Sequence, residues 1–411
     1  MMPELKMRIS QIQRGEIPKG YKKGPLGVVP VEWSEMPFST LFTSTSNYTD
    51  DLNAYPLYSL TIEDGITPKT ERYERSHLVK KENSYKVVRP NDYAYNPMNI
   101  RFGAVARHKG NKPVAVSGYY DIFTTVHQSD LAFMDSFLTC GAMITYYNKV
   151  STGSLVEKQR VHFADFLSFS LPLPPLKERK KIAEIIMLQD QVIELNDQII
   201  RQLVLMKKAC LRKIFPEHGN NVPEVRFPGY TNPWEQRKVR QIANRYDNLR
   251  IPIVANLRIA GTTPYYGANG IQDYVEGFTH EGEFVLVAED GANDLKNYPV
   301  KCVNGRIWVN NHAHVLQGKP EITDNQFLTY SINQADIESL LVGGGRAKLN
   351  AETLMDIELM LPSIDEQQII GSYIKNLDHL ITLHQRKRDE EKQKKKALMQ
   401  LLFSGIVRVT V

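Results

Sequence analysis

An internal repeat constrains this fold more than any other feature of the sequence. Residues 171–182 align with residues 359–370, which lie 188 positions later in the chain. The same offset holds without a gap for about 45 residues, as far as the match of residues 207–215 with residues 395–403. A gapless frame of this length indicates a duplication, so the chain contains two copies of one structural segment.

Each copy has the pattern of a long helix. In the first copy, apolar residues recur at steps of three and four, as on one face of a helix: Ile182, Ile185, Ile186, Val192, Ile193, Ile199, Ile200, Leu203, Met206 and Cys210. Pro174-Pro175 precede this stretch and Pro216 follows it, with no Gly or Pro between them. The second copy opens with the capping box of Ser363 and Glu366 and ends before Gly405. About 38 helical residues make a rod of roughly 57 Å.

A lone amphipathic rod of this length cannot bury its apolar stripe, so the two copies are expected to pair with each other. If each copy is preceded by a similar domain, the pairing is antiparallel and the halves are related by a pseudo-twofold. The second copy also carries a highly charged run over residues 386–396. This run is compatible with a solvated helix face, with contact to DNA phosphates, or with contact to a partner subunit.

The segments before the two helices repeat in outline but not in detail. Trp33 corresponds to Trp234, yet Pro174 lies 141 positions after the first Trp and Pro362 lies 128 positions after the second. Between these anchors the two sequences diverge almost completely. Similar helices that follow divergent heads indicate two heads with the same task and different targets.

The predicted fold is therefore mixed α/β, with two globular heads separated by two long helices that form an antiparallel coiled coil with a pseudo-twofold internal repeat. The predicted boundaries are an N-terminal tail over 1–20, a first head over 21–173, a first helix over 174–216, a second head over 217–361, and a second helix with the C-terminal tail over 362–411. Residues 7–17 faintly resemble residues 401–408, so we expect the N-terminal tail to pack beside the C-terminus.

Composition narrows the functional class only slightly. With 42% hydrophobic and 24% charged residues, the 411-residue chain has the composition of a soluble globular protein. No apolar run approaches the roughly 18 residues that span a bilayer, and the first residues lack the apolar core of a secretory signal. The three cysteines have no C-x-x-C spacing, so neither a disulfide framework nor a zinc site is indicated, and a reducing cytoplasm is the expected compartment. The net charge of +5 is compatible with a polyanionic partner.

No catalytic constellation emerges from the sequence. The glycine-rich residues 343–346 lack the G-K-[ST] ending of a phosphate loop. His312 and His314 share one face of a predicted strand, but no third metal ligand accompanies them. Residues 96–99, Asn-Pro-Met-Asn, resemble the N-P-P-[YF] motif of amino-methyltransferases, but Asn99 replaces the aromatic residue and no cofactor-binding glycine loop is present.

Both heads instead contain side chains that suit nucleic acid. Asn and Arg make bidentate contacts with adenine and guanine edges, and Lys contacts phosphates. The candidates of the first head are Lys69, Arg72, Arg75, Asn96, Asn99, Arg101, Arg107, Tyr119 and Tyr120. Those of the second head are Tyr265, Tyr266, Asn269, Asn293, Lys296, Asn310, Asn311, His312, Arg346 and Lys348. Asn and Asp beside Gly also form ordinary turns, so a purely structural role for individual residues stays open.

The chain resembles the specificity subunits of type I restriction-modification systems. The resemblance rests on the helix entries at residues 173–179 and 361–367, the Lys-Lys-Ala endings, the entry to the second head at residues 227–234, and head segments such as residues 95–99 and 265–273. It spans essentially the whole chain.

The resemblance implies a non-catalytic subunit that reads a bipartite site in double-stranded DNA, one half with each head, while the helices act as a ruler. It also implies docking of two modification subunits, which bind S-adenosylmethionine and methylate adenine, and of restriction subunits that use ATP and Mg²⁺, in the cytoplasm of a bacterial or archaeal cell. No cofactor or metal is expected in this chain. A stand-alone two-headed DNA-binding regulator and a chain with its own methyltransferase activity are the alternatives.

Overall fold

The structure is a computed structural model that describes residues 3–69, 84–155, 158–217, 219–343 and 347–409. The chain divides into two compact units. Unit 1 comprises Met1–Leu195 and Arg388–Val411, and unit 2 comprises Asn196–Lys387. The division falls within two long helices, so each unit contains one end of each helix.

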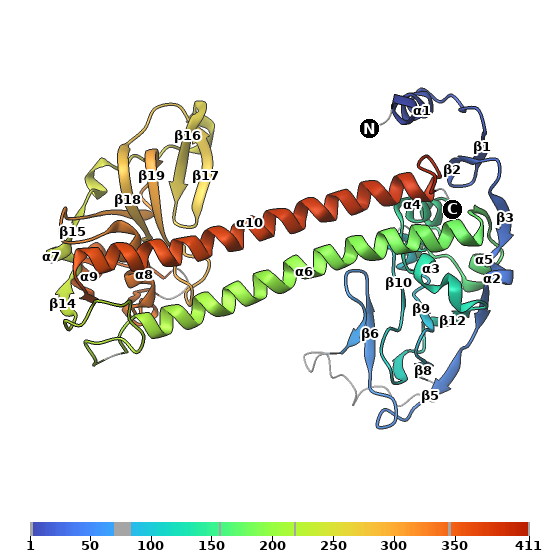
Figure 1. Cartoon of the computed structure of the whole chain (residues 1–411), viewed down its shortest axis with the longest axis horizontal. Coiled ribbons are helices and arrows are strands. Elements are labelled where there is room, and N and C mark those ends of the chain that lie inside the picture. The colour runs from blue at the N-terminus through green and yellow to red at the C-terminus, as the bar shows by residue number, and fades with distance from the viewer. Residues whose placement is uncertain (1–2, 70–83, 156–157, 218, 344–346, 410–411) are drawn as a thin grey trace. The chain divides into compact units, whose positions relative to one another are not determined.

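The two predicted helices are confirmed as α6 (Leu176–Ile214, 39 residues) and α10 (Ile364–Phe403, 40 residues). In unit 1, the first turns of α6 and the last turns of α10 pack in the same hydrophobic core. Farther along α6, the Gln189 amide donates to the Glu391 carboxylate of α10 at 2.6 Å. In unit 2 the partners again run in opposite directions, from Asn196 with His384 to Cys210 with Tyr373. The helices are therefore antiparallel partners in each unit (Figure 1).

One interhelical ion pair occurs twice, once in each unit. Lys395 contacts Asp190 at 2.5 Å in unit 1, and Lys207 contacts Asp378 at 2.6 Å in unit 2. The two lysines are 188 positions apart in the sequence, and so are the two aspartates. The sequence repeat is thus also a repeat of side-chain contacts.

The heads share more structure than their sequences indicate. A buried Trp, Trp33 or Trp234, leads into a strand, a one-turn helix and a second strand. These elements are β3 (Ser34–Pro37), α2 (Phe38–Leu41) and β4 (Phe42–Ser44) in unit 1, and β14 (Glu235–Lys238), α7 (Val239–Ile242) and β15 (Ala243–Arg245) in unit 2. The first strand pairs with the strand before the long helix in the same register in both units: β3 with β13 (Ser170–Leu173), and β14 with β21 (Glu358–Leu361).

Each head also contains an antiparallel sheet that begins in the same way. Unit 1 has the order β4–β12–β9–β10, with β12 (Asp121–Thr125), β9 (Tyr93–Tyr95) and β10 (Val105–Arg107). Unit 2 has the order β15–β20–β18–β19–β16–β17, with β20 (Ala313–Gly318), β18 (His280–Ala288), β19 (Val300–Val309), β16 (Ala260–Gly267) and β17 (Gly270–Val275). The first four strands correspond one to one, and β16 then adds to β19 in parallel.

The remaining elements differ between the heads. Unit 1 adds helix α1 (Pro3–Gln13), the hairpin β1 (Tyr21–Gly24) and β2 (Gly27–Pro30), the sheet of β5 (Asn47–Thr49), β8 (Tyr85–Val88) and β11 (Val114–Ser117), the hairpin β6 (Tyr58–Thr61) and β7 (Gly65–Pro68), helices α3 (Leu131–Phe137), α4 (Gly141–Val150) and α5 (Phe163–Leu167), and the 3-10 helices η2 (Ile100–Phe102) and η3 (Gln128–Asp130). Unit 2 adds α8 (Asn325–Gln334), α9 (Ala351–Asp356), η5 (Asp247–Leu249), η6 (Ala255–Leu257) and η7 (Glu338–Leu340).

Each head packs on the long helices through an aromatic residue at a helix end. Phe403 of α10 lies edge-on to Phe133 and Phe137 in the core of unit 1. In unit 2, Phe215 follows α6 and stacks on Phe327 at a centroid distance of 5.5 Å. Phe215 and Phe403 are 188 positions apart, so equivalent phenylalanines of the repeat anchor the two heads.

The segment after α10 returns to the beginning of the chain in unit 1. The Tyr21 hydroxyl donates to the Gly405 carbonyl at 2.7 Å, and Arg8 donates to the Ile406 carbonyl. Arg408 forms two hydrogen bonds with the buried Glu178 of α6. These contacts are those expected of an N-terminal tail that packs beside the C-terminal tail, while the predicted domain boundaries themselves stay a prediction.

Among the described residues, no helix combines the length and apolar character that a membrane span needs.

Candidate nucleic-acid interface

Most of the described candidate residues gather at equivalent places in the two heads. We call this place the loop edge, the end of the shared sheet where β9 and β18 end and where β12 and β20 begin. It consists of residues 96–104 and 118–120 in unit 1, and of residues 268–269, 289–299 and 310–312 in unit 2. Strand pairing places Asp121 opposite Tyr95 and Ala313 opposite Ala288, so the two edges correspond in the shared frame.

The loop edge lies where β12 and β20 begin, and the contacts with the long helices follow the opposite ends of these strands. Beyond the other end of β12, Asp130 forms an ion pair with Arg179 of α6 at 3.0 Å. Beyond the other end of β20, the backbone N–H of Asp324 donates to the Gln367 side chain of α10 at 3.1 Å. In each unit, the long helices therefore contact the segment beyond one end of these strands, and the loop edge is at the opposite end.

In unit 1 the Asn96 side chain shapes its own loop. It is buried, and its Oδ1 accepts the backbone N–H groups of Met98 at 3.1 Å and of Asn99 at 3.3 Å. Burial raises the pKa of the Tyr120 phenol, and a hydrogen bond with Asn96 lowers it in part. Asn96 thus joins the two loops of the edge, while Asn99 and Tyr119 are exposed to solvent.

Two of the four candidate arginines of this head are held by protein side chains. Arg101 is buried and donates to Gln159. Arg107 forms a bidentate pair with Asp135 and also donates to Asn91 at 2.6 Å. The hydrogen bond to Asp135 raises the pKa of the Arg107 guanidinium, although burial lowers it. Asn96, Arg101 and Arg107 thus make hydrogen bonds within the protein that support the loops, while their contact with DNA stays a prediction.

Lys69 follows β7 and is exposed, away from the loop edge as defined above. Arg72 and Arg75 lie outside the described residues.

In unit 2 the hairpin turn between β16 and β17 is tied to the long loop after β18. The Asn269 amide donates to the Gly291 carbonyl at 2.9 Å, and its carbonyl oxygen accepts the backbone N–H of Asn293 at 2.9 Å. The side chains of Asn293 and Lys296 are exposed along this loop. The two loops therefore form one surface.

The third loop of this edge is anchored by ring and amide contacts. His312 Nδ1 lies 2.5 Å from Asp290 Oδ1, and the side-chain Oδ1 of Asn310 accepts the backbone N–H of His312 at 2.8 Å. Asn310 is buried, whereas Asn311 between these two residues is exposed. Of the three candidates, Asn311 is the most open to a ligand.

A charged network lies beneath this surface. Glu289 accepts hydrogen bonds from Arg250 at 2.6 Å and forms an ion pair with Lys348 at 2.9 Å. Burial raises the pKa of the Glu289 carboxyl, but the bonds from these two cations outweigh it, and the net pKa is lowered. The neighbouring Asp247 is bound to the buried His314 at 2.7 Å. Burial raises the pKa of Asp247, but the His314 bond, the Val315 backbone N–H and the nearby Arg250 charge together outweigh it, and the net pKa is lowered.

Tyr265 and Tyr266 belong to the interior of the head. Tyr265 is 1% exposed, and its hydroxyl bonds the backbone of Ile253, while the Arg258 guanidinium lies 4.2 Å from the centre of its ring. Tyr266 is buried in an apolar cluster of the sheet. These two candidates therefore pack the sheet and present no surface to DNA. Arg346 lies outside the described residues.

His312 and His314 bind different aspartates, Asp290 and Asp247. Within the described ranges, no cluster of three or more His, Cys, Asp or Glu side chains is arranged to hold a metal ion.

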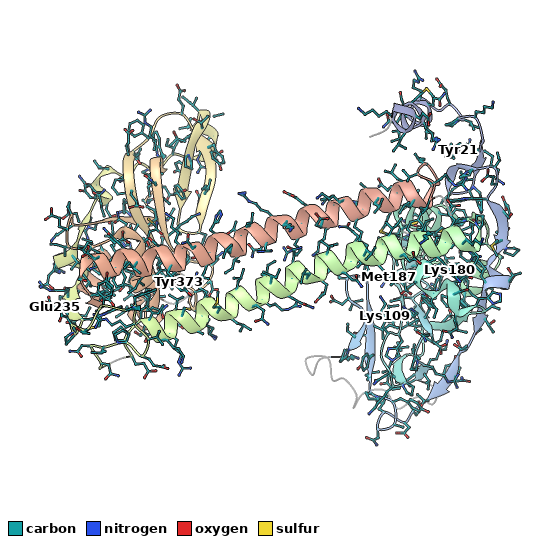
Figure 2. All side chains as sticks on the ribbon, viewed as in Figure 1. Tyr21, Lys109, Lys180, Met187, Glu235 and Tyr373 are labelled. Atoms are coloured by element: carbon teal, nitrogen blue, oxygen red, sulfur yellow. The ribbon has the colours of Figure 1, made fainter. Side chains whose placement is uncertain are left out.

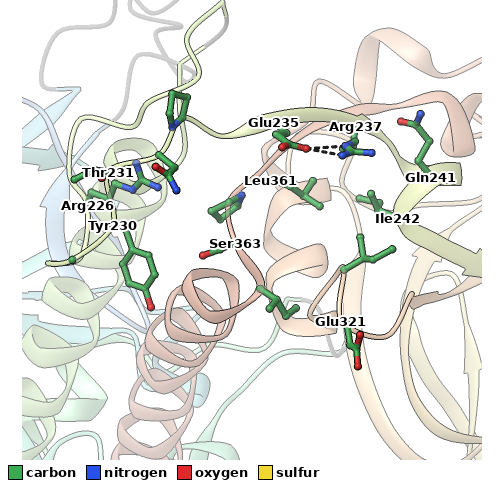
Figure 3. Close-up of a pocket in the computed structure, with 16 residues that line it drawn as sticks. Arg226, Tyr230, Thr231, Glu235, Arg237, Gln241, Ile242, Glu321, Leu361 and Ser363 are labelled. Carbon is green, nitrogen blue, oxygen red and sulfur yellow. Dashed lines mark hydrogen bonds and ion pairs between the residues drawn. The ribbon is translucent and has the colours of Figure 1, made fainter.

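A pocket of about 460 Å³ opens elsewhere in unit 2, at the start of α10 (Figure 3). Tyr230 and Ser363 line it, and Glu235 and Arg237 form an ion pair of 2.6 Å on its wall. It lies by β14 and β21, and none of the candidate residues lines it.

The sequence pattern of the type I restriction modification DNA specificity domain matches residues 231–393. The type I specificity subunit S.HindORF215P of Haemophilus influenzae is 44% identical over 149 residues, which are 36% of this chain and 38% of that protein. The MjaVIII specificity subunit of Methanocaldococcus jannaschii is 23% identical over 270 residues, 59% of this chain and 63% of that protein. Residues 231–393 therefore form a type I restriction modification DNA specificity domain, and the chain as a whole is similar to type I specificity subunits. The matches span less than two thirds of the length of these relatives.

Solved structures share the fold of this chain. The type I S subunit from M. genitalium superposes with a TM-score of 0.62 at 12% identity, covering 92% of this chain and 97% of that one. A chain from a structure of the assembly and conformational transition of the type I system superposes with a TM-score of 0.53 at 15% identity, covering 92% and 99%. The predicted mixed α/β architecture with two long helices is thereby confirmed, and solved type I S subunits have the same fold.

Proposed function

We propose that this chain is a specificity subunit of a type I restriction-modification system. In this role it reads a bipartite DNA site, one half with each loop edge, and delivers the site to modification subunits that methylate adenine. The observation that carries the proposal is the equivalence of the two loop edges. They occupy corresponding ends of two sheets that have the same strand arrangement, one in each head. The two edges nevertheless differ in loop length and in side chains. A common frame with different loops suits two readers of different sequences.

The exposed side chains of both edges have the chemistry of base readout. Asn99 in unit 1, and Asn293 and Asn311 in unit 2, have exposed side chains. An amide that donates and accepts at once pairs with the N6 and N7 atoms of adenine, and such a pair discriminates by about 1–3 kcal/mol. Lys296 suits a phosphate contact that sets the register of the protein on DNA.

Apolar side chains on the long helices support docking of two partner subunits. Val192 and Leu195 of α6 are exposed, and so are Leu380 and Leu383 of α10, which stand 188 positions later. Figure 2 labels two further exposed apolar side chains, Met187 of α6 and Tyr373 of α10. Exposed apolar side chains clustered in this way mark surfaces for other proteins. A duplicated surface suits two copies of one partner.

In this proposal the chain binds no cofactor and catalyses no step itself. S-adenosylmethionine belongs to the modification subunits, and ATP and Mg²⁺ belong to the restriction subunits. The loop edges hold the duplex while a partner extracts the target adenine from the stack.

The test is to produce the chain together with the modification subunits of its own system and to map methylated adenines on genomic DNA. We expect one bipartite sequence with two defined halves. Exchanging residues 243–350 for the corresponding segment of another specificity subunit changes one half only. Exchanging residues 42–162 is the matched experiment and changes the other half.

Two outcomes contradict the proposal. Modification subunits that methylate the same sites without this chain would show that it does not direct them. Transfer of a labelled methyl group from S-adenosylmethionine to DNA by the purified chain alone would show that it is not a purely binding subunit.

A further inference from the structure

The loop edge of unit 1 presents an aromatic side chain beside the exposed amide of Asn99. Phe102 ends the 3-10 helix η2 and is 53% exposed. In a 3-10 helix the side chains at positions i and i+3 lie above each other on one face. Asn99, immediately before η2, and Phe102 are therefore on the same face, whereas Ile100 and Arg101 between them are buried.

The backbone that carries these two side chains is fixed by hydrogen bonds. The N–H of Ile100 donates to Asn96 at 2.9 Å, and that of Phe102 donates to Asn99 at 2.9 Å. Gly103 closes the turn at a φ of 95°, a conformation that side chains other than glycine rarely adopt. From α4, the Asn148 amide donates to the Arg101 carbonyl at 2.9 Å. The exposed ring is thus carried by a well-supported turn and not by a loose loop.

The ring also has a fixed neighbour. The Arg101 guanidinium lies over it, 5.2 Å from its centre, and Gln159 binds the same guanidinium. A cation over an aromatic face restrains the ring and leaves its other side to solvent. An exposed aromatic that is held in this way contributes little to the core and is suited to contact a ligand.

We propose that Phe102 contacts the 5-methyl group of a thymine within one or two base-pair steps of the base contacted by Asn99. The proposal rests on the proposed function. Apolar side chains recognise thymine through this methyl group in the major groove, and Asn recognises adenine there. Three residues of a 3-10 helix rise by about 6 Å, which matches one to two base-pair steps of about 3.4 Å. The sequence alone does not distinguish Phe102 from a core residue, because phenylalanine is most often buried.

The experiment measures binding of the complex with its modification subunits to a duplex that carries its mapped site. Each thymine is replaced in turn by deoxyuridine, which lacks only the methyl group. We expect one replacement, in one half-site, to weaken binding about fourfold, the equivalent of roughly 0.8 kcal/mol for one buried methyl group. Phe102→Ala binds the thymine duplex more weakly and no longer distinguishes deoxyuridine at that position. Phe102→Leu keeps part of the discrimination.

Phe278→Ala is the matched control, because Phe278 is 43% exposed under the Arg306 guanidinium at 4.8 Å, but precedes β18 at the end away from the loop edge. It should bind both duplexes as the unaltered complex does. Unchanged thermal unfolding of Phe102→Ala shows that the head remains folded.

The inference about Phe102 is overturned if no thymine replacement affects the unaltered complex, or if Phe102→Ala keeps the full discrimination. The proposed function fails separately, if the unaltered complex does not prefer its mapped site over an unrelated duplex.

Discussion

Glu289 is a carboxylate whose environment makes its charge structurally important. It is 14% exposed at the end of β18 and binds Arg250 and Lys348. Hydrogen bonds to a charged group contribute about 1.5–3 kcal/mol, and removing one partner leaves the cations poorly compensated. Glu289 therefore fixes the base of the unit 2 loop edge.

We predict that Glu289→Gln lowers the free energy of unfolding of this head by about 1–3 kcal/mol at pH 7. The folded-state pKa of Glu289 is lowered, so its stabilisation is present above the unfolded pKa near 4.5 and is lost as the pH falls through the folded value. The difference between the variant and the unaltered chain should therefore shrink below about pH 4.5. Urea unfolding at a series of pH values measures both effects.

The control for this prediction is Glu281→Gln, which removes the exposed pair with Arg306 in the same head. Exposed pairs contribute about 0–1 kcal/mol, so this variant should be nearly neutral. Equal effects of the two substitutions would contradict the role assigned to Glu289.

At the same scale, a second prediction concerns Asn96. Asn96→Ala removes the acceptor that organises the turn before η2 and leaves two backbone N–H groups without it. We expect weaker binding of the mapped duplex with an unchanged preference for bases, because Asn96 positions the loop and does not read it. A changed base preference at one position, measured on a panel of single-base variants, would instead make Asn96 a reader.

The residue types singled out in the sequence lie mostly in the loops of the two edges, but the burial of each one was not predictable. Asn, Tyr and Arg clusters led to the loops that form both edges. The sequence does not reveal that Tyr265 is in the core and Tyr119 in solvent, because both stand next to another tyrosine near a turn. Burial depends on which strands pair, and the strands of these heads pair across inserted segments.

At the scale of elements, the long helices were predictable because their signal is local. Apolar spacing, caps and the absence of Gly and Pro are all read within one stretch of sequence. The shared sheet was not predictable, since only Trp33 and Trp234 mark it in the sequence. Its strands pair across inserted segments of different length, and hydrophobic residues in three-residue strands such as β9 give no clear period.

The exposed apolar pairs of the helices lead to a prediction about stoichiometry. Val192→Ser with Leu195→Ser should abolish one docking surface, and Leu380→Ser with Leu383→Ser should abolish the other. Each double variant should then bind one modification subunit where the unaltered chain binds two, because the surfaces are copies of each other. The mass of the purified complex measures this, and Gln202→Ser on α6 is the control. Two bound subunits in both double variants would contradict docking at these side chains.

At the scale of the whole molecule, the duplication separates the parts that repeat between the two halves from the parts that differ between them. The ion pairs Asp190–Lys395 and Lys207–Asp378, and the anchors Phe215 and Phe403, repeat with one offset. Contacts that repeat in this way preserve one geometry of helix and head. The loop edges do not repeat, so each can change its target without disturbing that geometry.

The length of α6 and α10 should therefore set the gap between the two halves of the DNA site. We predict that adding Glu-Ala-Ala-Lys after both Leu195 and Leu383, equivalent positions of the repeat, widens the permitted gap and leaves both half-site sequences unchanged. Four helical residues add about 6 Å, close to one or two base-pair steps of about 3.4 Å. Insertion in both helices keeps the ion pairs Asp190–Lys395 and Lys207–Asp378 opposite each other, because these pairs lie on either side of the inserted turn.

Methylation mapping of cells that express the lengthened chain with its modification subunits measures the gap directly. The same four residues inserted after Asn220, in the loop between α6 and β14, lengthen the chain without lengthening a helix and should leave the gap as it was. A gap that stays unchanged in the helix variant, with methylation still directed to the same two halves, would mean that the DNA or the modification subunits set the spacing. A gap that widens only in the helix variant would identify the paired helices as the element that measures it.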